Sequence, residues 1–287
     1  MKLALGTVQF GLAYGIAGSG SVVPEAEVRR IIALAAGRGV DCIDTAAGYG
    51  DIEQRIAQLA PQAQLSFVSK IPAVPANDPA AFVRQSVGQS IERLGSRLRA
   101  LMFHRQEDLA GPAAAQIWES AIDAIGARPI ALGVSCYEPQ ALQTLARTFP
   151  IAIAQLPCNA FDQRVTSLDG TKLEVHVRSA FLQGLLLQDA QFAATKLPVA
   201  AAAVTRWRSW CNEHGLTALQ AALSVVRAIG EQHSLSHCVV GVESASQFEE
   251  IAAAWDAAEP IAAAELAIDD PAIIDPRTWK RTAGAAA

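Results

Sequence analysis

The sequence has few cysteines, and no two of them form a Cys-x-x-Cys pair. Zinc knuckles and disulfide frameworks both need cysteines at short, regular spacings, so the sequence argues against both. Widely separated cysteines are typical of proteins in a reducing compartment, and we expect a cytoplasmic protein. The cysteines are Cys42, Cys136, Cys158, Cys211 and Cys238.

Metal-binding patterns are also missing. Histidine ligands usually recur at short spacings from each other or from acidic or cysteine partners. The histidines at positions 176, 214, 233 and 237 show no such spacing. The sequence therefore predicts no metal.

The chain has fewer positively charged residues than negatively charged ones. The chain has 23 Lys and Arg against 28 Asp and Glu, a formal net charge of -5, and its arginines are scattered. This pattern disfavours binding to nucleic acid or to an anionic membrane. The first apolar run ends at Gly6, which is too short for a signal-peptide core or a membrane span. We expect small molecules as partners.

Apolar residues are abundant. They make up 51% of the chain and charged residues 18%, which is enough to bury a large core. Short apolar runs recur, and between them the apolar residues fall three and four apart, as in amphipathic helices. The eight runs, each a predicted strand, span residues 2–6, 40–44, 65–70, 99–104, 130–135, 151–156, 173–180 and 238–242.

This alternation of strands and helices requires parallel strands joined by crossover helices. Eight repeats predict a closed (β/α)8 TIM barrel, a single domain over residues 1–287 with residues 275–287 as a loose tail. An open doubly wound sheet is the rival fold, but no Gly-x-Gly-x-x-Gly loop follows the first strand. No linker rich in Pro, Gly or Ser divides the chain. The sequence therefore favours the barrel.

Active sites of such barrels lie at the carboxyl ends of the strands. There the sequence places Asp44 after the second strand, Tyr49 five residues on, Lys70 after the third and His104 after the fourth. A tyrosine can give a proton to a carbonyl oxygen if a nearby ammonium lowers its pKa, and Lys70 is placed to do so. Asp44 would keep Lys70 charged, and His104 would orient the carbonyl.

Several motifs along nearly the whole chain resemble those of the aldo-keto reductase family. They are GTVQFG from residue 6, DTAAGYG from 44, SK from 69, FHR from 103, GVSCYEP from 133 and VVGVESASQFEE from 239. The resemblance, to a bacterial branch with short chains, implies an oxidoreductase that uses NAD(P)H. Such an enzyme would reduce an aldehyde or ketone, or oxidise an alcohol or sugar, with Tyr49 as the proton donor. It also implies a monomer.

The resemblance further implies a cofactor site. Arg178 matches the position whose side chain packs on the nicotinamide ring, and the segment after the eighth strand should hold the adenosine. A 2'-phosphate is usually bound by Lys or Arg, but Gly241 and Gln247 stand where some relatives carry these cations. NADP(H) is the expected cofactor, with NAD(H) as the alternative. The implied contacts are Ser135, Gln155, Arg178, Ser179, Gly184, Gly241, Ser244, Gln247 and Glu250.

Two other functions remain open on the same barrel. One is a redox-silent regulatory protein that binds a nucleotide, although the chain keeps all four candidate catalytic residues. The other is a lyase or aldolase with Lys70 as a Schiff-base nucleophile. That chemistry needs a lysine without a carboxylate partner, and Asp44 argues against it.

Overall fold

The computed structural model describes residues 1–61, 64–168 and 172–279. Within them, eight parallel strands follow one another around a closed barrel, and β8 pairs with β1. All eight predicted strands are present, each within two residues of its predicted ends. Their bounds are β1 Lys2–Gly6, β2 Cys42–Asp44, β3 Ser66–Ile71, β4 Leu98–Phe103, β5 Ala131–Ser135, β6 Ile153–Pro157, β7 Glu174–Arg178 and β8 His237–Gly241.

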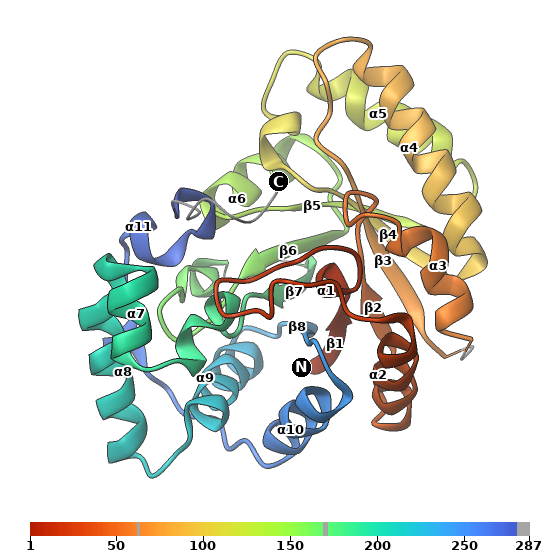
Figure 1. The fold of residues 1–287 in the computed structure, drawn as a ribbon. Helices are drawn as coiled ribbons and strands as arrows, with labels where there is room; N and C mark the ends of the chain where they lie inside the picture. Colours follow the sequence, from red (N-terminus) through yellow and green to blue (C-terminus); the bar gives the residue numbers. More distant parts are fainter. Residues whose placement is uncertain (62–63, 169–171, 280–287) are drawn as a thin grey trace.

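Helices surround the barrel, as Figure 1 shows. The predicted (β/α)8 barrel is therefore confirmed. In the described part of the chain, no helix is long and apolar enough to cross a membrane. The helices are α1 Val8–Gly11, α2 Glu25–Gly37, α3 Ile52–Leu59, α4 Pro79–Leu94, α5 Ala114–Ile125, α6 Pro139–Thr148, α7 Ala190–Lys196, α8 Ala201–Glu213, α9 Ala218–Gln232, α10 Ala245–Asp256 and α11 Pro271–Ile274.

Apolar side chains form two layers. The larger layer lies between the outer face of the barrel and the helices. The smaller one fills the inside of the barrel, where the space is narrow and most side chains are small. Polar side chains lie above and below this inner layer, at the two ends of the barrel. The inner layer consists of Ala4, Cys42, Val68, Ala100, Met102, Ile153 and Val239.

The end of the described chain is fixed rather than loose. Asp275 accepts a hydrogen bond from the backbone of Arg277 at the start of a short 3-10 helix, η7 (Pro276–Thr278), and Trp279 packs against the core. The expectation of a loose tail from residue 275 is therefore wrong for residues 275–279. The rest of the expected tail, 280–287, lies outside the described residues.

Candidate active site

A buried ion pair stands at the carboxyl ends of β2 and β3. Lys70 Nζ donates to Asp44 Oδ1 at 2.6 Å, and the two side chains are 1% and 6% exposed. Lys70 also donates to the carbonyl oxygen of Thr45, at 3.1 Å, while Asp44 Oδ2 accepts from Gln155 Nε2, at 2.8 Å. The predicted pairing of Lys70 with Asp44 is present in this geometry. Both carboxylate oxygens are satisfied, which a buried charge requires.

The loop after β2 brings Tyr49 beside this pair. Lys70 Nζ lies 5.5 Å from the centroid of the Tyr49 ring. The loop rests directly on α1, because a Cβ atom on Gly11 would lie only 1.9 Å from the carbonyl oxygen of Tyr49. Gly50, in the left-handed region at φ 64°, approaches Gly11 from the loop side. Two glycines thus fix where the Tyr49 backbone can lie.

His104 packs against Tyr49. The two rings meet edge to face, with centroids 5.7 Å apart. Burial, together with the positive charges of Lys70 and Arg178, lowers the pKa of His104 to about 3. His104 is therefore a neutral imidazole near pH 7, able to donate through one ring nitrogen and accept through the other.

The pKa of Tyr49 shifts opposite to the sequence expectation. Burial raises it above its ordinary value, and the Asp44 carboxylate raises it further. Lys70 does not lower it, because its charge is opposed by Asp44 at 2.6 Å and burial lowers the pKa of Lys70 itself. The prediction that Lys70 lowers this pKa is wrong for the protein as it stands. Tyr49 keeps its proton.

A cavity of about 370 Å³ opens beside these residues. Asp44 and Tyr49 line it, while Lys70 and His104 lie against Tyr49 rather than in the described wall. Ser135 and Ser244 are not in that wall either; Ser244 caps α10 by accepting from the Gln247 backbone. The other implied cofactor contacts do line the cavity: Gln155, Arg178, Ser179, Gly184, Gly241, Gln247 and Glu250.

The segment between α1 and α2 covers part of this cavity. Figure 1 shows it in dark red, reaching across the barrel in front of β7. Hydrogen bonds hold it to the barrel; among them, Gln183 donates to the hydroxyl of Tyr14 at 3.2 Å, and the Ser19 backbone donates to the Glu243 carboxylate at 2.9 Å. Gly184, at φ 89°, lies so close that an added Cβ would reach Ala17 at 2.9 Å. We call residues 12–24 the covering loop.

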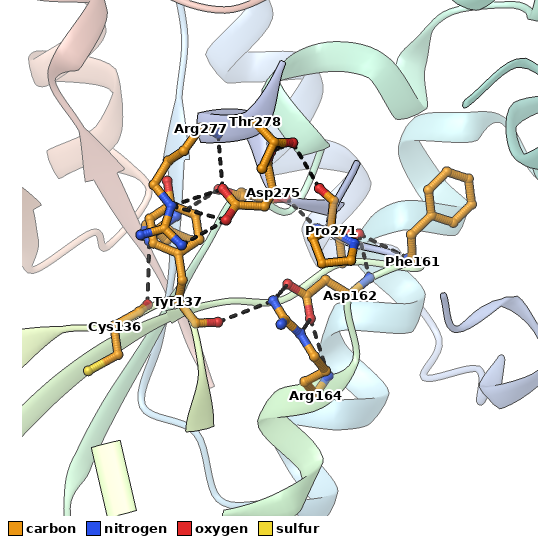
Figure 2. A network of polar contacts seen from close by, with 12 residues as sticks. Cys136, Tyr137, Phe161, Asp162, Arg164, Pro271, Asp275, Arg277 and Thr278 are labelled. Atoms are coloured by element: carbon orange, nitrogen blue, oxygen red, sulfur yellow. Dashed lines mark hydrogen bonds and ion pairs between the residues drawn. The ribbon is translucent and has the colours of Figure 1, made fainter. Parts of the chain in front are cut away.

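Arg178 lies at the Tyr49 end of the cavity and is held by stacking. Its guanidinium carbon is 4.2 Å from the ring centroid of Tyr137, and that of Arg277 is 3.6 Å from the same ring. Arg178 also donates to the carbonyl oxygen of Cys136, at 3.4 Å. Figure 2 shows Arg277 held in turn by Asp275, so the C-terminal segment supports this wall.

Sequence reasoning did not single out several residues of this site. Gln9 and Glu243 fall inside the motifs that carried the resemblance, yet only the folded chain shows that both line the cavity. Glu53, in the first turn of α3, is 1% exposed. It accepts hydrogen bonds from Ser69 and Ser90 and pairs with Arg93.

Similar structures have the same architecture. The aldo-keto reductase AKR11C1 from Bacillus halodurans, in its holo form, is 17% identical with a TM-score of 0.70, covering 97% of this chain and 92% of that one. The glycerol dehydrogenase AKR11B4 from Gluconobacter oxydans is 19% identical with a TM-score of 0.63, covering 87% and 85%. No curated protein matches the sequence.

The family model of the Aldo/keto reductase family matches residues 2–268, which is most of the chain. The match runs from β1 through the whole barrel and includes every residue of the ion pair, the Tyr49 loop and the cavity wall. This chain therefore belongs to the Aldo/keto reductase family and is an NAD(P)-dependent oxidoreductase that interconverts carbonyl compounds and alcohols.

Proposed function

We propose that the enzyme performs this reaction at Tyr49, on a small aldehyde or ketone in one direction and an alcohol or sugar in the other. The observation that carries the proposal is the placement of the Tyr49 ring. It lines the cavity, with neutral His104 at its edge and the Lys70–Asp44 pair beneath it. These are a proton donor, a carbonyl-orienting group and a fixed charge pair within one cluster.

The nicotinamide cofactor supplies or accepts the hydride when it is bound. In the reducing direction Tyr49 gives its proton to the carbonyl oxygen, and its raised pKa ensures that the proton is there to give. His104, being neutral, can donate a hydrogen bond to the same oxygen without adding charge. The positive charge of Arg178, which acts to lower the pKa of Tyr49, stabilises the tyrosinate that remains after the transfer.

The same geometry disfavours a Schiff-base lyase. An imine needs a free amine that the substrate can reach. Lys70 is 1% exposed and its ammonium group is bonded to Asp44 and to the carbonyl oxygen of Thr45. Oxidoreduction through Tyr49 requires none of these contacts to break.

The cavity suits a dinucleotide. It extends from Asp44 and Tyr49 to Gln247 and Glu250 on α10. Gln9 Oε1 is buried at its wall with no hydrogen-bond partner among the described residues, so the wall offers an acceptor for a ligand donor. Gln155, Arg178, Ser179 and Gly184 would hold the nicotinamide half, and Gly241, Gln247 and Glu250 the adenosine half.

Charges at the adenosine end favour NAD(H) over NADP(H). Among the described lining residues, Arg178 is the one Lys or Arg, and it lies at the Tyr49 end. Glu243 and Glu250 line the adenosine end. The start of α10, which could bind a phosphate, already donates its Ala245 N–H to Glu27 Oε1, at 2.6 Å. A carboxylate accepts a hydrogen bond from a ribose 2'-hydroxyl but repels a 2'-phosphate.

The test compares the two reduced cofactors by fluorescence titration and by turnover of a panel of aldehydes, ketones and sugars. We expect NADH to bind more tightly than NADPH. Glu243→Gln should reduce the ratio of the two dissociation constants by about tenfold, which corresponds to about 1.4 kcal/mol. Glu249→Gln, on the exposed side of α10, is the matched control and should leave the ratio unchanged. NADPH binding more tightly than NADH would overturn the preference, and a failure to bind either would overturn the function.

A further inference from the structure

A second polar cluster lies at the other end of the barrel, below the inner apolar layer. Glu174 and His176 are two residues apart on β7 and therefore face the same side. His237 is the register partner of His176 on β8. One side-chain ligand atom from each of the three residues lies within 4.8 Å of the other two. His176 is fully buried, and the Glu174 side chain is 33% exposed, so solvent reaches the cluster.

Two nitrogen atoms of this cluster lack partners. The Nδ1 atoms of His176 and His237 are both buried without a hydrogen-bond partner in the described structure. His237 Nδ1 is directed at Glu174 Oε1 but lies 3.9 Å from it, too far for a hydrogen bond. Two ligands that share one tetrahedral ion with bonds of about 2.0–2.2 Å lie about 3.3–3.6 Å apart, so these two atoms would have to approach by a few tenths of an ångström to share one. Leaving such buried atoms unpaired costs free energy, which a bound ligand would recover.

A carboxylate orients one of the histidines. His237 Nε2 lies 3.1 Å from Asp41 Oδ1, and Asp41 is itself held by Lys2. When Nε2 donates to this carboxylate, the proton is on Nε2 and the lone pair of Nδ1 faces Glu174. Histidines that bind metals are commonly fixed in this way, with the second ring nitrogen donating to a carboxylate.

Arg99 already places positive charge in the cluster. The register of β3 and β4 shifts opposite Arg99, leaving it unpaired in the sheet. Such a bulge redirects a side chain. Its Nη2 atom lies 2.8 Å from Glu174 Oε1 and 3.0 Å from His176 Nε2, while Nη1 donates to Glu174 Oε2 at 3.1 Å. His176 Nε2 also lies 2.8 Å from Glu174 Oε1. A metal ion at Oε1 would displace Nη2 and replace this hydrogen bond, and Nη1 could keep Oε2.

We propose that Glu174, His176 and His237 form a site for a divalent transition metal, zinc above all, with Asp41 orienting His237 and Arg99 competing for Glu174. Two imidazoles and one carboxylate are a ligand set typical of Zn²⁺ rather than of Ca²⁺ or Mg²⁺. The site is remote from Tyr49 and links β7 to β8, so its role is to stabilise the barrel. The sequence shows no metal-ligand spacing around these histidines, but the fold brings Glu174, His176 and His237 together.

The test titrates chelator-treated protein with zinc chloride, using calorimetry and thermal unfolding. We expect one Zn²⁺ per chain and a higher unfolding temperature. Co²⁺ should give the visible absorption of a low-symmetry site. His237→Gln and Glu174→Gln should each weaken Zn²⁺ binding by at least about tenfold. His214→Gln is the matched control, since that ring stacks on Trp210 outside the cluster, and it should bind Zn²⁺ as the natural chain does.

Arg99→Gln gives the sharpest outcome. Removing the competing guanidinium should tighten Zn²⁺ binding by about tenfold. The far-ultraviolet spectrum and the thermal unfolding of this variant are measured as well, because an unfolded chain would expose the five free cysteines, which also bind Zn²⁺. The proposal is overturned if the natural chain binds no stoichiometric Zn²⁺ at about 100 µM, or if His237→Gln and Glu174→Gln bind it unchanged.

Discussion

The proton on Tyr49 is the one on which the proposed reaction depends. Burial and the Asp44 carboxylate raise its pKa, so the phenol is fully protonated near neutral pH. The sequence predicts Tyr49 near Lys70, where the structure has it, but the prediction assumed that Lys70 acts on it as a free cation. In the folded chain Asp44 is much nearer to Lys70 than Tyr49 is, and this distance cannot be deduced from residue types.

Replacing Tyr49 tests its role directly. Tyr49→Phe removes the proton and keeps the ring against His104, so we expect kcat to fall by about 10²–10⁴-fold. The dissociation constant for NADH should change by no more than about twofold, because the ring remains in the wall. Steady-state kinetics and fluorescence titration measure the two quantities.

Tyr14→Phe is the matched control. It removes another hydroxyl at the cavity, the one that accepts from Gln183, and should keep most of the turnover. Turnover by Tyr49→Phe equal to that of the natural chain would show that another group gives the proton, or that water does.

At the scale of elements, the site depends on how the loop after β2 rests on α1. The loop carries Tyr49, and its backbone contacts Gly11 so closely that no other residue fits there without a shift. The short apolar runs predict the strands on either side because strand and helix periodicities are local. The contact between α1 and the loop joins residues that are far apart in the sequence. The local periodicities of strands and helices therefore cannot predict it.

Gly11→Ala should therefore damage catalysis without removing any chemical group. The new Cβ would lie 1.9 Å from the Tyr49 carbonyl oxygen, so the loop must move and carry the phenol with it. We expect kcat to fall by at least about tenfold, since a displacement of about 1 Å can cost 10²-fold. The NADH-induced fluorescence change and the far-ultraviolet spectrum should persist.

The same loop provides a control. A Cβ on Gly48 would meet nothing within 4 Å, so Gly48→Ala should keep turnover close to that of the natural chain. If Gly11→Ala kept it too, the position of Tyr49 would not depend on this contact.

At the scale of the whole molecule, the barrel was predictable and much of its polar interior was not. Eight apolar runs with helical spacing between them are enough to give the strand order, because parallel strands need crossovers. Glu53, Glu174 and Glu243 each have a partner far along the chain, which is Ser90 on α4, Arg99 on β4 and Ser19 in the covering loop, respectively. Active sites of (β/α)8 barrels lie at the carboxyl ends of the strands, so predicting the barrel was enough to find the candidate catalytic residues. No comparable regularity applies to the amino ends of the strands.

Burial of a neutral histidine makes the stability of the whole barrel depend on pH. The pKa of His104 is lowered from 6.5 to about 3 in the folded chain, first by burial and then by Lys70 and Arg178. Below pH 6.5 the unfolded chain takes up this proton and the folded chain does not. The contribution of His104 is thus complete above pH 6.5 and is lost as the pH falls toward 3, by at most about 1.4 kcal/mol per pH unit.

His104→Gln should remove this dependence. Urea unfolding at pH 7.5 and pH 5 measures the loss of stability on acidification, and we expect the variant to lose up to about 2 kcal/mol less than the natural chain. Tyr49→Phe, which changes the neighbouring ring and keeps the imidazole, should lose as much as the natural chain. Equal losses for His104→Gln and the natural chain would mean that His104 takes up its proton in the folded state. A charged imidazole beside Lys70 would then be the group that orients the carbonyl, and turnover would fall as the pH rises through its pKa.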